Sequence, residues 1–232
     1  PRLEQITALL PNVNCGACGK PGCSGFAEEL LSGKANIDAC KSADFAVKEK
    51  IARLLGKAVE QKDKLSAVLL CNGGAKVKNR FLYYGIEDCI SANLVLGGQK
   101  ECIFGCLGYG NCVKACPFGA ITMSKPDHLP VVNQEKCRAC NKCVEACPKK
   151  LFVLLPHTAK VYVACSSNET GKDTKSFCSV GCIACKSCER TCKFGAIHVI
   201  DNLAVIDYKK CTSCCNCIKV CPVKVIKTRP IR

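Results

Sequence analysis

The sequence predicts an α+β protein with a small helical domain followed by two tandem copies of a cysteine-rich module, joined by short strand-containing segments. Three observations favour this class. Four early cysteines lie among apolar residues with helical spacing. Two later stretches each contain eight regularly spaced cysteines, and a short apolar run typical of a buried strand precedes each of them.

Residues 1–62 form the expected helical domain. Its cysteines follow the pattern Cys-x2-Cys-x4-Cys-x16-Cys and are Cys15, Cys18, Cys23 and Cys40. Helices are expected at the opening residues 3–10, at 24–31 and at 43–55, with glycines after the last two as stop signals. Two helices over four thiolates can hold one metal centre, and a structural zinc site is the alternative to an iron–sulfur cluster here.

Residues 182–232 carry the most specific pattern, Cys-x2-Cys-x2-Cys-x3-Cys, twice over. This spacing is typical of bacterial ferredoxins with two [4Fe-4S] clusters, in which the fourth cysteine of each run ligates the other cluster. A hairpin with an Asp-Asn turn is expected at 197–206, between the two runs. The predicted ligand sets are Cys182, Cys185, Cys188 and Cys221 for one cluster, and Cys192, Cys211, Cys214 and Cys217 for the other. Two zinc sites are the less favoured alternative.

Residues 102–155 form a first ferredoxin-like domain of the same kind. The stretch Cys-Pro-Phe-Gly-Ala-Ile at 116–121 matches Cys-Lys-Phe-Gly-Ala-Ile at 192–197, so the two domains are internal repeats. The first half has wider spacing, Cys-x3-Cys-x5-Cys-x3-Cys. The same rule predicts the sets Cys102, Cys106, Cys112 and Cys147, and Cys116, Cys137, Cys140 and Cys143.

Two connecting segments, 63–101 and 156–181, contain further cysteines. Each begins with an expected strand, at 66–70 and 160–165, that leads into a cysteine, and a helix is expected near 86–94. We assign a sixth cluster to Cys71, Cys89, Cys165 and Cys178; the alternative is four free buried thiols. Cys215 is out of register and is expected to be a bystander.

The charge and cysteine content support buried iron–sulfur clusters in a reducing cytoplasm. The chain has 25 cysteines among 232 residues, an odd number with metal-type spacing, and shows no signal peptide. Its formal charge is +15, but six [4Fe-4S] clusters with their thiolates would contribute about −12 and leave about +3. This removes most of the argument for a nucleic-acid partner. No run reaches the roughly 18–20 apolar residues that span a bilayer.

No residue pattern in the chain indicates bond-making chemistry. The three histidines, His128, His157 and His198, lie apart, and no glycine-rich stretch matches a dinucleotide or phosphate-binding fingerprint. We therefore expect no catalytic residue, no flavin and no nicotinamide in this chain. Five clusters from the motifs, and a sixth from the remaining cysteines, predict an electron-transfer protein.

Two motifs resemble one family closely. The stretch Asn-Cys-Gly-x-Cys-Gly-x-Pro-x-Cys at 14–23 and the run from Cys102 to Pro117, followed by a further ferredoxin pair, resemble the B subunit of the Rnf complex over nearly the whole chain. The resemblance implies an iron–sulfur electron-transfer subunit of a membrane-bound ferredoxin:NAD+ oxidoreductase that translocates Na+ or H+. It implies soluble ferredoxin and other complex subunits as partners, and a place on the cytoplasmic face of the membrane. Family members carry an N-terminal membrane helix, which we expect to have been removed before Pro1.

A basic face near the cluster loops is expected to steer acidic ferredoxin. Its candidate residues are Lys114, Lys142, Lys149, Lys150, Lys186, Lys193, Lys209, Lys210 and Lys219. One alternative function is a polyferredoxin-type wiring subunit of a hydrogenase or heterodisulfide-type reductase. Another is a nucleic-acid-binding protein with structural clusters, which the near-neutral loaded charge disfavours.

Overall fold

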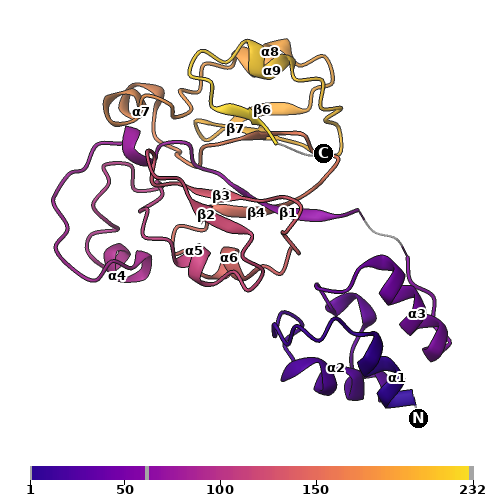
Figure 1. Ribbon diagram of the computed structural model, residues 1–232. Helices are drawn as coiled ribbons and strands as arrows, with labels where there is room; N and C mark the ends of the chain where they lie inside the picture. The colour runs from indigo at the N-terminus through magenta and orange to yellow at the C-terminus, as the bar shows by residue number, and fades with distance from the viewer. Residues whose placement is uncertain (1, 61–62, 230–232) are drawn as a thin grey trace. The chain divides into compact units, whose positions relative to one another are not determined.

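The computed structural model describes residues 2–60 and 63–229 of the chain (Figure 1). The chain divides into two compact units, and each is described by itself. The first comprises Pro1–Lys64 with Arg138–Lys142, and the second comprises Leu65–Cys137 with Cys143–Arg232. In the part of the chain that the structure describes, no helix is long and apolar enough to cross a membrane.

The first unit is helical, as predicted. It contains α1 (Arg2–Leu9), α2 (Gly22–Leu31), a short 3-10 helix (Ile37–Ala39) and α3 (Phe45–Leu55). Helix α3 begins after Asp44, whose carboxylate accepts the amide of Val47 at 2.9 Å. It ends at Gly56 in the left-handed conformation. The apolar faces of the three helices meet in one core.

The second unit contains two copies of one arrangement. The first copy consists of β1 (Leu65–Leu69), a 3-10 turn (Gly74–Lys76), α4 (Cys89–Leu94), α5 (Asn111–Lys114), β2 (Ile121–Met123), β3 (Pro130–Val132), α6 (Lys142–Glu145) and β4 (Phe152–Pro156). The second consists of β5 (Val161–Val163), α7 (Gly171–Phe177), α8 (Ser187–Thr191), β6 (Ile197–Ile200), β7 (Leu203–Ile206), α9 (Asn216–Lys219) and β8 (Ile226–Thr228). In each copy, short helices lie along one side of a hairpin (Figure 1). The α+β class is therefore confirmed.

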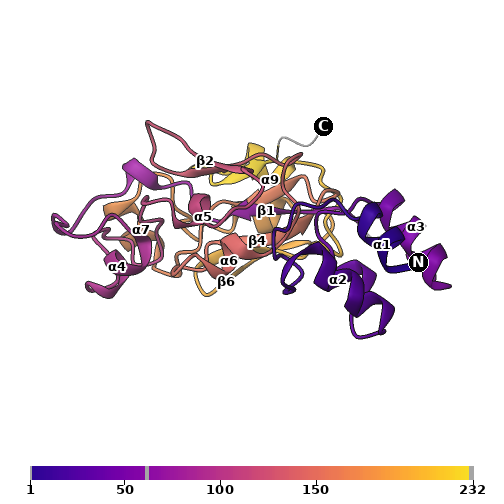
Figure 2. The ribbon, with the colours of Figure 1, turned by 60° about the horizontal axis from the view of Figure 1, so that its bottom comes forward.

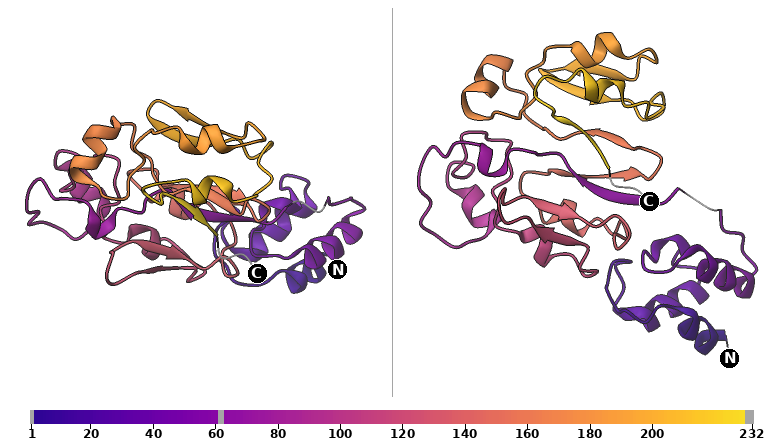
Figure 3. Two further views of the ribbon diagram at one scale, coloured as in Figure 1. Left: turned by 90° about the horizontal axis from the view of Figure 1, so that it is seen from above. Right: turned by 45° about the horizontal axis from the view of Figure 1, so that its top comes forward.

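The strand that opens each copy pairs with the strand that closes it. Strands β1 and β4 are antiparallel, with Leu65 opposite Pro156 and Leu69 opposite Phe152 (Figure 2). Strands β5 and β8 pair in the same way, with Val161 opposite Thr228. Each connecting segment therefore shares a sheet with the ferredoxin-like domain that follows it. Between β1 and α5 the chain leaves the strands in a broad loop that carries α4 (Figure 3).

The hairpin predicted at 197–206 is also confirmed. Strands β6 and β7 pair directly, with Ile200 opposite Leu203. The two turn residues, Asp201 and Asn202, have φ values of 45° and 63°. A two-residue hairpin turn requires positive φ at both positions, because this turn type matches the right-handed twist of the flanking strands. The corresponding hairpin of the first copy, β2–β3, is joined by a longer loop.

A buried polar network links the two copies. Arg229, which follows β8, donates to the carbonyl oxygens of Pro156 at 2.7 Å and Ala159 at 3.1 Å, and to Oε1 of Gln134 at 2.8 Å. It also donates to the hydroxyl of Ser66 in β1. Only 5 % of Arg229 is exposed. The end of the second copy is therefore anchored to the sheet and loops of the first.

Candidate cluster sites

The second copy brings together the two ligand sets predicted for it. A cavity of about 310 Å³ is lined by Cys182, Cys185, Cys188 and Cys221, with Val225 and Ile226 among its apolar walls. A second cavity, of about 370 Å³, is lined by the set that contains Cys192, Cys211, Cys214 and Cys217.

Cys215 also borders the second of these cavities, but its thiol has another partner. Its sulfur donates to the carbonyl oxygen of Ser213 at 3.3 Å, and its backbone lies in the left-handed region immediately before α9. This local bond agrees with a bystander role.

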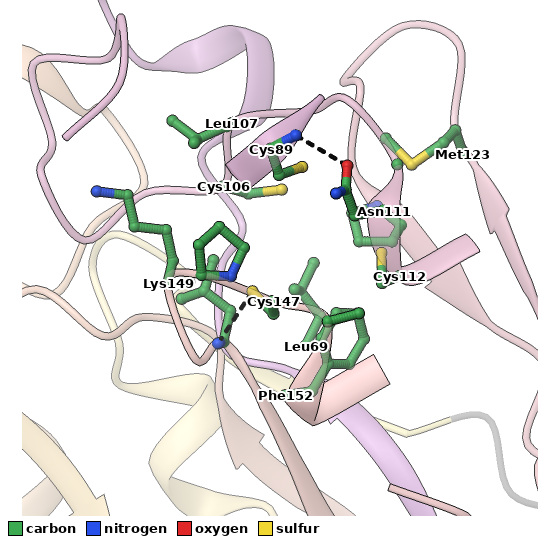
Figure 4. A pocket seen from close by; sticks show the side chains of 15 residues that line it. Leu69, Cys89, Cys106, Leu107, Asn111, Cys112, Met123, Cys147, Lys149 and Phe152 are labelled. Carbon is green, nitrogen blue, oxygen red and sulfur yellow. Dashed lines mark hydrogen bonds between the residues drawn. The ribbon is translucent and has the colours of Figure 1, made fainter. Parts of the chain in front are cut away.

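The first copy has a four-cysteine cavity whose members differ from the predicted set. The cavity, of about 370 Å³, is lined by Cys89, Cys106, Cys112 and Cys147. In Figure 4 the four sulfurs point from separate segments toward one space. Cys102, which the spacing assigned here, is absent from the wall, and Cys89 takes its place.

Cys102 lines a different cavity, of about 340 Å³, together with Cys71, Cys165 and Cys178. The sequence grouped the last three with Cys89. The structure therefore brings together all eight of these cysteines in two groups of four, with Cys89 and Cys102 exchanged between the predicted sets.

Three members of the other predicted set of the first copy lie in one apolar core. Cys137 and Cys143 are buried there, and Cys116 packs against them. The sulfur of Cys137 accepts the amide of Ala67 at 3.4 Å. Cys140, the fourth member of that set, lies in the segment 138–142, which groups with the first unit.

The four cysteines of the first unit come from three segments: Cys15 and Cys18 lie in the loop before α2, Cys23 lies in α2, and Cys40 follows the 3-10 helix. Cys18 and Cys23 pack against the core that contains Cys40, and the thiol of Cys15 lies 3.2 Å from the hydroxyl of Ser42. The side chain of Asn14 accepts the amide of Cys23 at 2.8 Å and so shapes the loop. Burial raises the pKa of Cys40, and nearby Cys18 and Cys23 act in the same direction.

Backbone amides point at several of the sulfurs. In three of the cysteines that end a Cys-x3-Cys step, the sulfur accepts the amide four residues later at 3.4 Å: Ala120 for Cys116, Leu151 for Cys147 and Ala196 for Cys192. Such donors stabilise negative charge on a ligating thiolate and tune the metal behind it.

A buried thiol without a nearby cation remains protonated. Such a thiol becomes a thiolate when a bound metal supplies positive charge beside it. Burial raises the pKa of Cys102 and of Cys112 to about 12, and that of Cys188 and of Cys217 to about 11. Iron supplies the positive charge that makes such thiolates favourable. Within residues 2–60 and 63–229, no group of three or more His, Cys, Asp or Glu side chains is placed to hold a single metal ion.

Comparison of the two copies in the sequence indicates the exchange of Cys89 and Cys102, although the spacing within one copy does not. Cys102, Cys106, Cys112 and Cys116 have gaps of three, five and three residues, and so do Cys178, Cys182, Cys188 and Cys192. Cys102 is thus the counterpart of Cys178. In this alignment Tyr109 occupies the position of Cys185, so the first copy lacks the middle cysteine of its motif.

Three family models match separate parts of the chain. A model for an Fe-S cluster matches residues 10–42, one for a 4Fe-4S dicluster domain matches residues 101–151, and one for a 4Fe-4S binding domain matches residues 204–227. These matches support [4Fe-4S] clusters in the chain.

Three relatives align with almost the whole chain. The B subunit of the ion-translocating oxidoreductase complex of Methanosarcina acetivorans is 41% identical over 99% of this chain and 87% of its own length. The B subunit of the Na(+)-translocating ferredoxin:NAD(+) oxidoreductase complex of Acetobacterium woodii is 42% identical over 97% and 68%. The proton-translocating counterpart from Clostridium ljungdahlii is 40% identical over 98% and 81%. The chain belongs to the family of B subunits of the ion-translocating oxidoreductase complexes, the Rnf complexes.

Proposed function

We propose that this chain relays single electrons from reduced ferredoxin to other subunits of a membrane-associated, ion-translocating ferredoxin:NAD+ oxidoreductase, on the cytoplasmic face of the membrane. The observation that carries the proposal is the presence in one unit of four cavities, each lined by at least four cysteines. The names of the relatives support the wider complex and its redox partners.

The chain holds, shields and tunes its redox groups. When bound, [4Fe-4S] clusters supply one-electron carriers. The cysteines fix them, while apolar walls such as Leu151 and Phe152 in the first copy and Val225 and Ile226 in the second keep water away. The amide donors to Cys116, Cys147 and Cys192 stabilise the anionic centres and raise their reduction potentials.

We place electron entry at the second copy because its thiols reach the surface. Of the 25 cysteines, all of them in the described part of the chain, Cys185 and Cys214 are exposed. Lys186 and Arg190 are exposed beside Cys185. Burial acts to raise the pKa of the Cys185 thiol, but hydrogen bonds with Ser187 and, as the smallest contribution, the charge of Arg190 lower it overall. Short distances from surface to cluster favour electron exchange with a docked protein, and positive charge attracts an acidic one.

Lys149 is unsuited to the docking role that the sequence suggested. Its ammonium donates to the carbonyl oxygens of Gly97 and Ile103, at 2.6 Å each. Burial lowers its pKa. The side chain therefore holds the loop around Cys102 in place, and its charge is committed to that loop.

The test is the rate at which reduced ferredoxin reduces the loaded protein, followed by stopped-flow absorbance. Lys186→Glu and Arg190→Glu should each slow reduction roughly threefold to tenfold at low salt, and the difference should disappear at high salt because exposed charges are screened. The matched control is Lys125→Glu, an exposed lysine in the β2–β3 loop of the first copy. Equal slowing by the control, or a rate independent of salt, would refute entry at this face.

A further inference from the structure

The cavity that contains Cys71, Cys102, Cys165 and Cys178 draws two ligands from each copy. We propose that these four thiolates hold a [4Fe-4S] cluster shared by the two copies, and that Cys89 completes the separate cluster site of Cys106, Cys112 and Cys147. The proposal assigns ligands and rests on the cluster chemistry of the proposed function, although it does not depend on ferredoxin as the electron donor.

The four thiols occupy equivalent places in the two copies. Cys71 lies two residues after the end of β1, and Cys165 lies two residues after the end of β5. Cys102 lies four positions before Cys106, as Cys178 lies four positions before Cys182. A ligand set made of two equivalent pairs is what an interface between two related copies produces.

Glycine allows the backbone to approach these sulfurs. A Cβ atom on Gly73 would stand 3.7 Å from the sulfur of Cys71 and 3.6 Å from that of Cys178, and would overlap Val77. The sulfurs of Cys71 and Cys178 therefore lie near one point even though they come from different copies. Gly105 and Gly181 occupy equivalent positions in the two copies. A Cβ on Gly105 would stand 3.6 Å from the sulfur of Cys102, and one on Gly181 would stand 3.5 Å from that of Cys178.

Hydrogen bonds join the segments that carry the four thiols. The hydroxyl of Ser166, next to Cys165, donates to the carbonyl oxygen of Leu70, next to Cys71, at 2.9 Å. The amide of Lys78 donates to the carbonyl oxygen of Phe177 at 3.1 Å, and Val77 forms a β-bridge with Cys178. Cys102 and Cys178 pack in the same small apolar cluster as Val77. The site is therefore preformed by protein contacts.

A second set of contacts delivers Cys89 to the neighbouring site. Asp88 begins α4 by accepting the amides of Ile90 and Ser91 at 2.8 and 2.9 Å. Asn111, at the start of α5, accepts the amide of Cys89 at 2.8 Å (Figure 4). Its side-chain amide donates to Asp88 at 2.5 Å. These hydrogen bonds hold Cys89 beside Cys112. Cys89 thereby takes the place of the middle cysteine of the motif, whose position in the first copy is occupied by Tyr109.

Pairs of substitutions distinguish this assignment from the pairing predicted by spacing. Iron and acid-labile sulfide are measured per chain on the full protein, purified anaerobically. Wild type should contain about 24 of each, since six cubanes are expected. Cys71→Ala with Cys102→Ala should remove about 4, because both residues serve one cluster, whereas Cys71→Ala with Cys89→Ala should remove about 8, because these residues serve two. Cys215→Ala should remove none.

Each alternative predicts a different count. If Cys71→Ala with Cys89→Ala removes about 4 and Cys71→Ala with Cys102→Ala removes about 8, the spacing-based pairing is right and the exchange is wrong. About 20 iron in wild type, with no loss on Cys71→Ala, would show that the shared cluster does not exist. Zinc without iron would defeat the proposed function as well, and full iron without reduction by ferredoxin would defeat only the choice of donor.

A measurement on the unaltered protein covers the case in which a variant fails to fold. Native alkylation of the loaded chain under anaerobic conditions, read by mass spectrometry, should modify Cys215 and spare Cys71, Cys89, Cys102, Cys165 and Cys178. Removal of iron with a chelator should expose all of them. Labelling of any of the five before iron removal would overturn the assignment of that residue as a ligand.

Discussion

Replacing Arg229 with alanine should weaken the second unit more than any exposed substitution would. Arg229 is 5 % exposed, and its guanidinium donates to four acceptors that belong to or flank the first copy. Hydrogen bonds from a charged donor are worth more than neutral ones, and a buried acceptor left without a partner carries a desolvation cost. The loss therefore depends on which of the acceptors can find another partner.

Most of the groups that accept from Arg229 keep another hydrogen-bond partner when it is removed. The hydroxyl of Ser66 already donates to Gln134 at 2.5 Å, and the carbonyl oxygen of Pro156 accepts the amide of Ala159 at 3.0 Å, so three of the acceptors keep a partner. The carbonyl oxygen of Ala159 loses the guanidinium that donates to it. Leaving one buried acceptor without a donor costs about 1–3 kcal/mol of the free energy of unfolding. The space vacated by the long side chain costs about 1–2 kcal/mol more, once the gain from no longer burying a charged guanidinium has been subtracted. A net destabilisation of about 3 kcal/mol follows.

The assay is urea unfolding of the loaded protein under anaerobic conditions, followed by far-ultraviolet circular dichroism and by the visible absorbance of the clusters. With a slope of about 2 kcal/mol per molar urea, Arg229→Ala should lower the midpoint by about 1.5 M. Arg190→Ala is the control, since Arg190 is exposed and bonds one hydroxyl at 3.4 Å; its midpoint should move by less than about 0.3 M. Equal midpoints for the two variants would refute the reasoning.

Three further predictions concern the cluster sites. Cys89→Ala should lose about 4 iron per chain, and adding Tyr109→Cys should restore them, because Tyr109 occupies the position of the middle cysteine of the second copy. An iron assay checks this, and no recovery would show that the two positions are not equivalent. Gly73→Ala should cost about 1–3 kcal/mol and release iron from the shared site, since the added Cβ overlaps Val77; retention of all iron and of the urea midpoint would contradict it. Arg229→Met should lower the reduction potential of the cluster that Cys137 is predicted to ligate, because a cation is removed from the surroundings of that cysteine. A potentiometric titration measures this, and an unchanged potential would show that the charge of Arg229 is screened.

The features that depend on neighbouring residues could be predicted from the sequence. The helices of the first unit and the β6–β7 hairpin follow from local periodicity, capping residues and a two-residue turn. The grouping of the second copy's cysteines around two cavities follows from a spacing that itself encodes a loop geometry. In these cases the information needed lies within one short stretch of chain.

The strand partners and the exchanged ligands depend on contacts between distant residues. Nothing local indicates that β1 pairs with β4, more than eighty residues later, or β5 with β8. The wider spacing of the first motif is compatible with Cys102 as a fourth ligand, and only comparison of the two copies shows that Cys102 corresponds to Cys178. Cys89 lies outside any motif, and the Asp88–Asn111 bond that places it is visible only in three dimensions.

Two of the links between the copies differ in their dependence on iron. The network of Arg229 uses hydrogen bonds alone, whereas the thiols of Cys71, Cys102, Cys165 and Cys178 are expected to join the copies through metal–thiolate bonds. Without iron, burial raises the pKa of Cys102, Cys165 and Cys178, and neutral thiols attract one another only weakly. Iron removal and Arg229→Ala should therefore be more than additive in separating the copies, because each leaves the other as the main remaining link. The rate of limited proteolysis between β4 and β5 measures how readily the copies separate. Simple additivity of the two effects would mean that the apolar contacts around Tyr162 and Tyr208 suffice to hold the copies together.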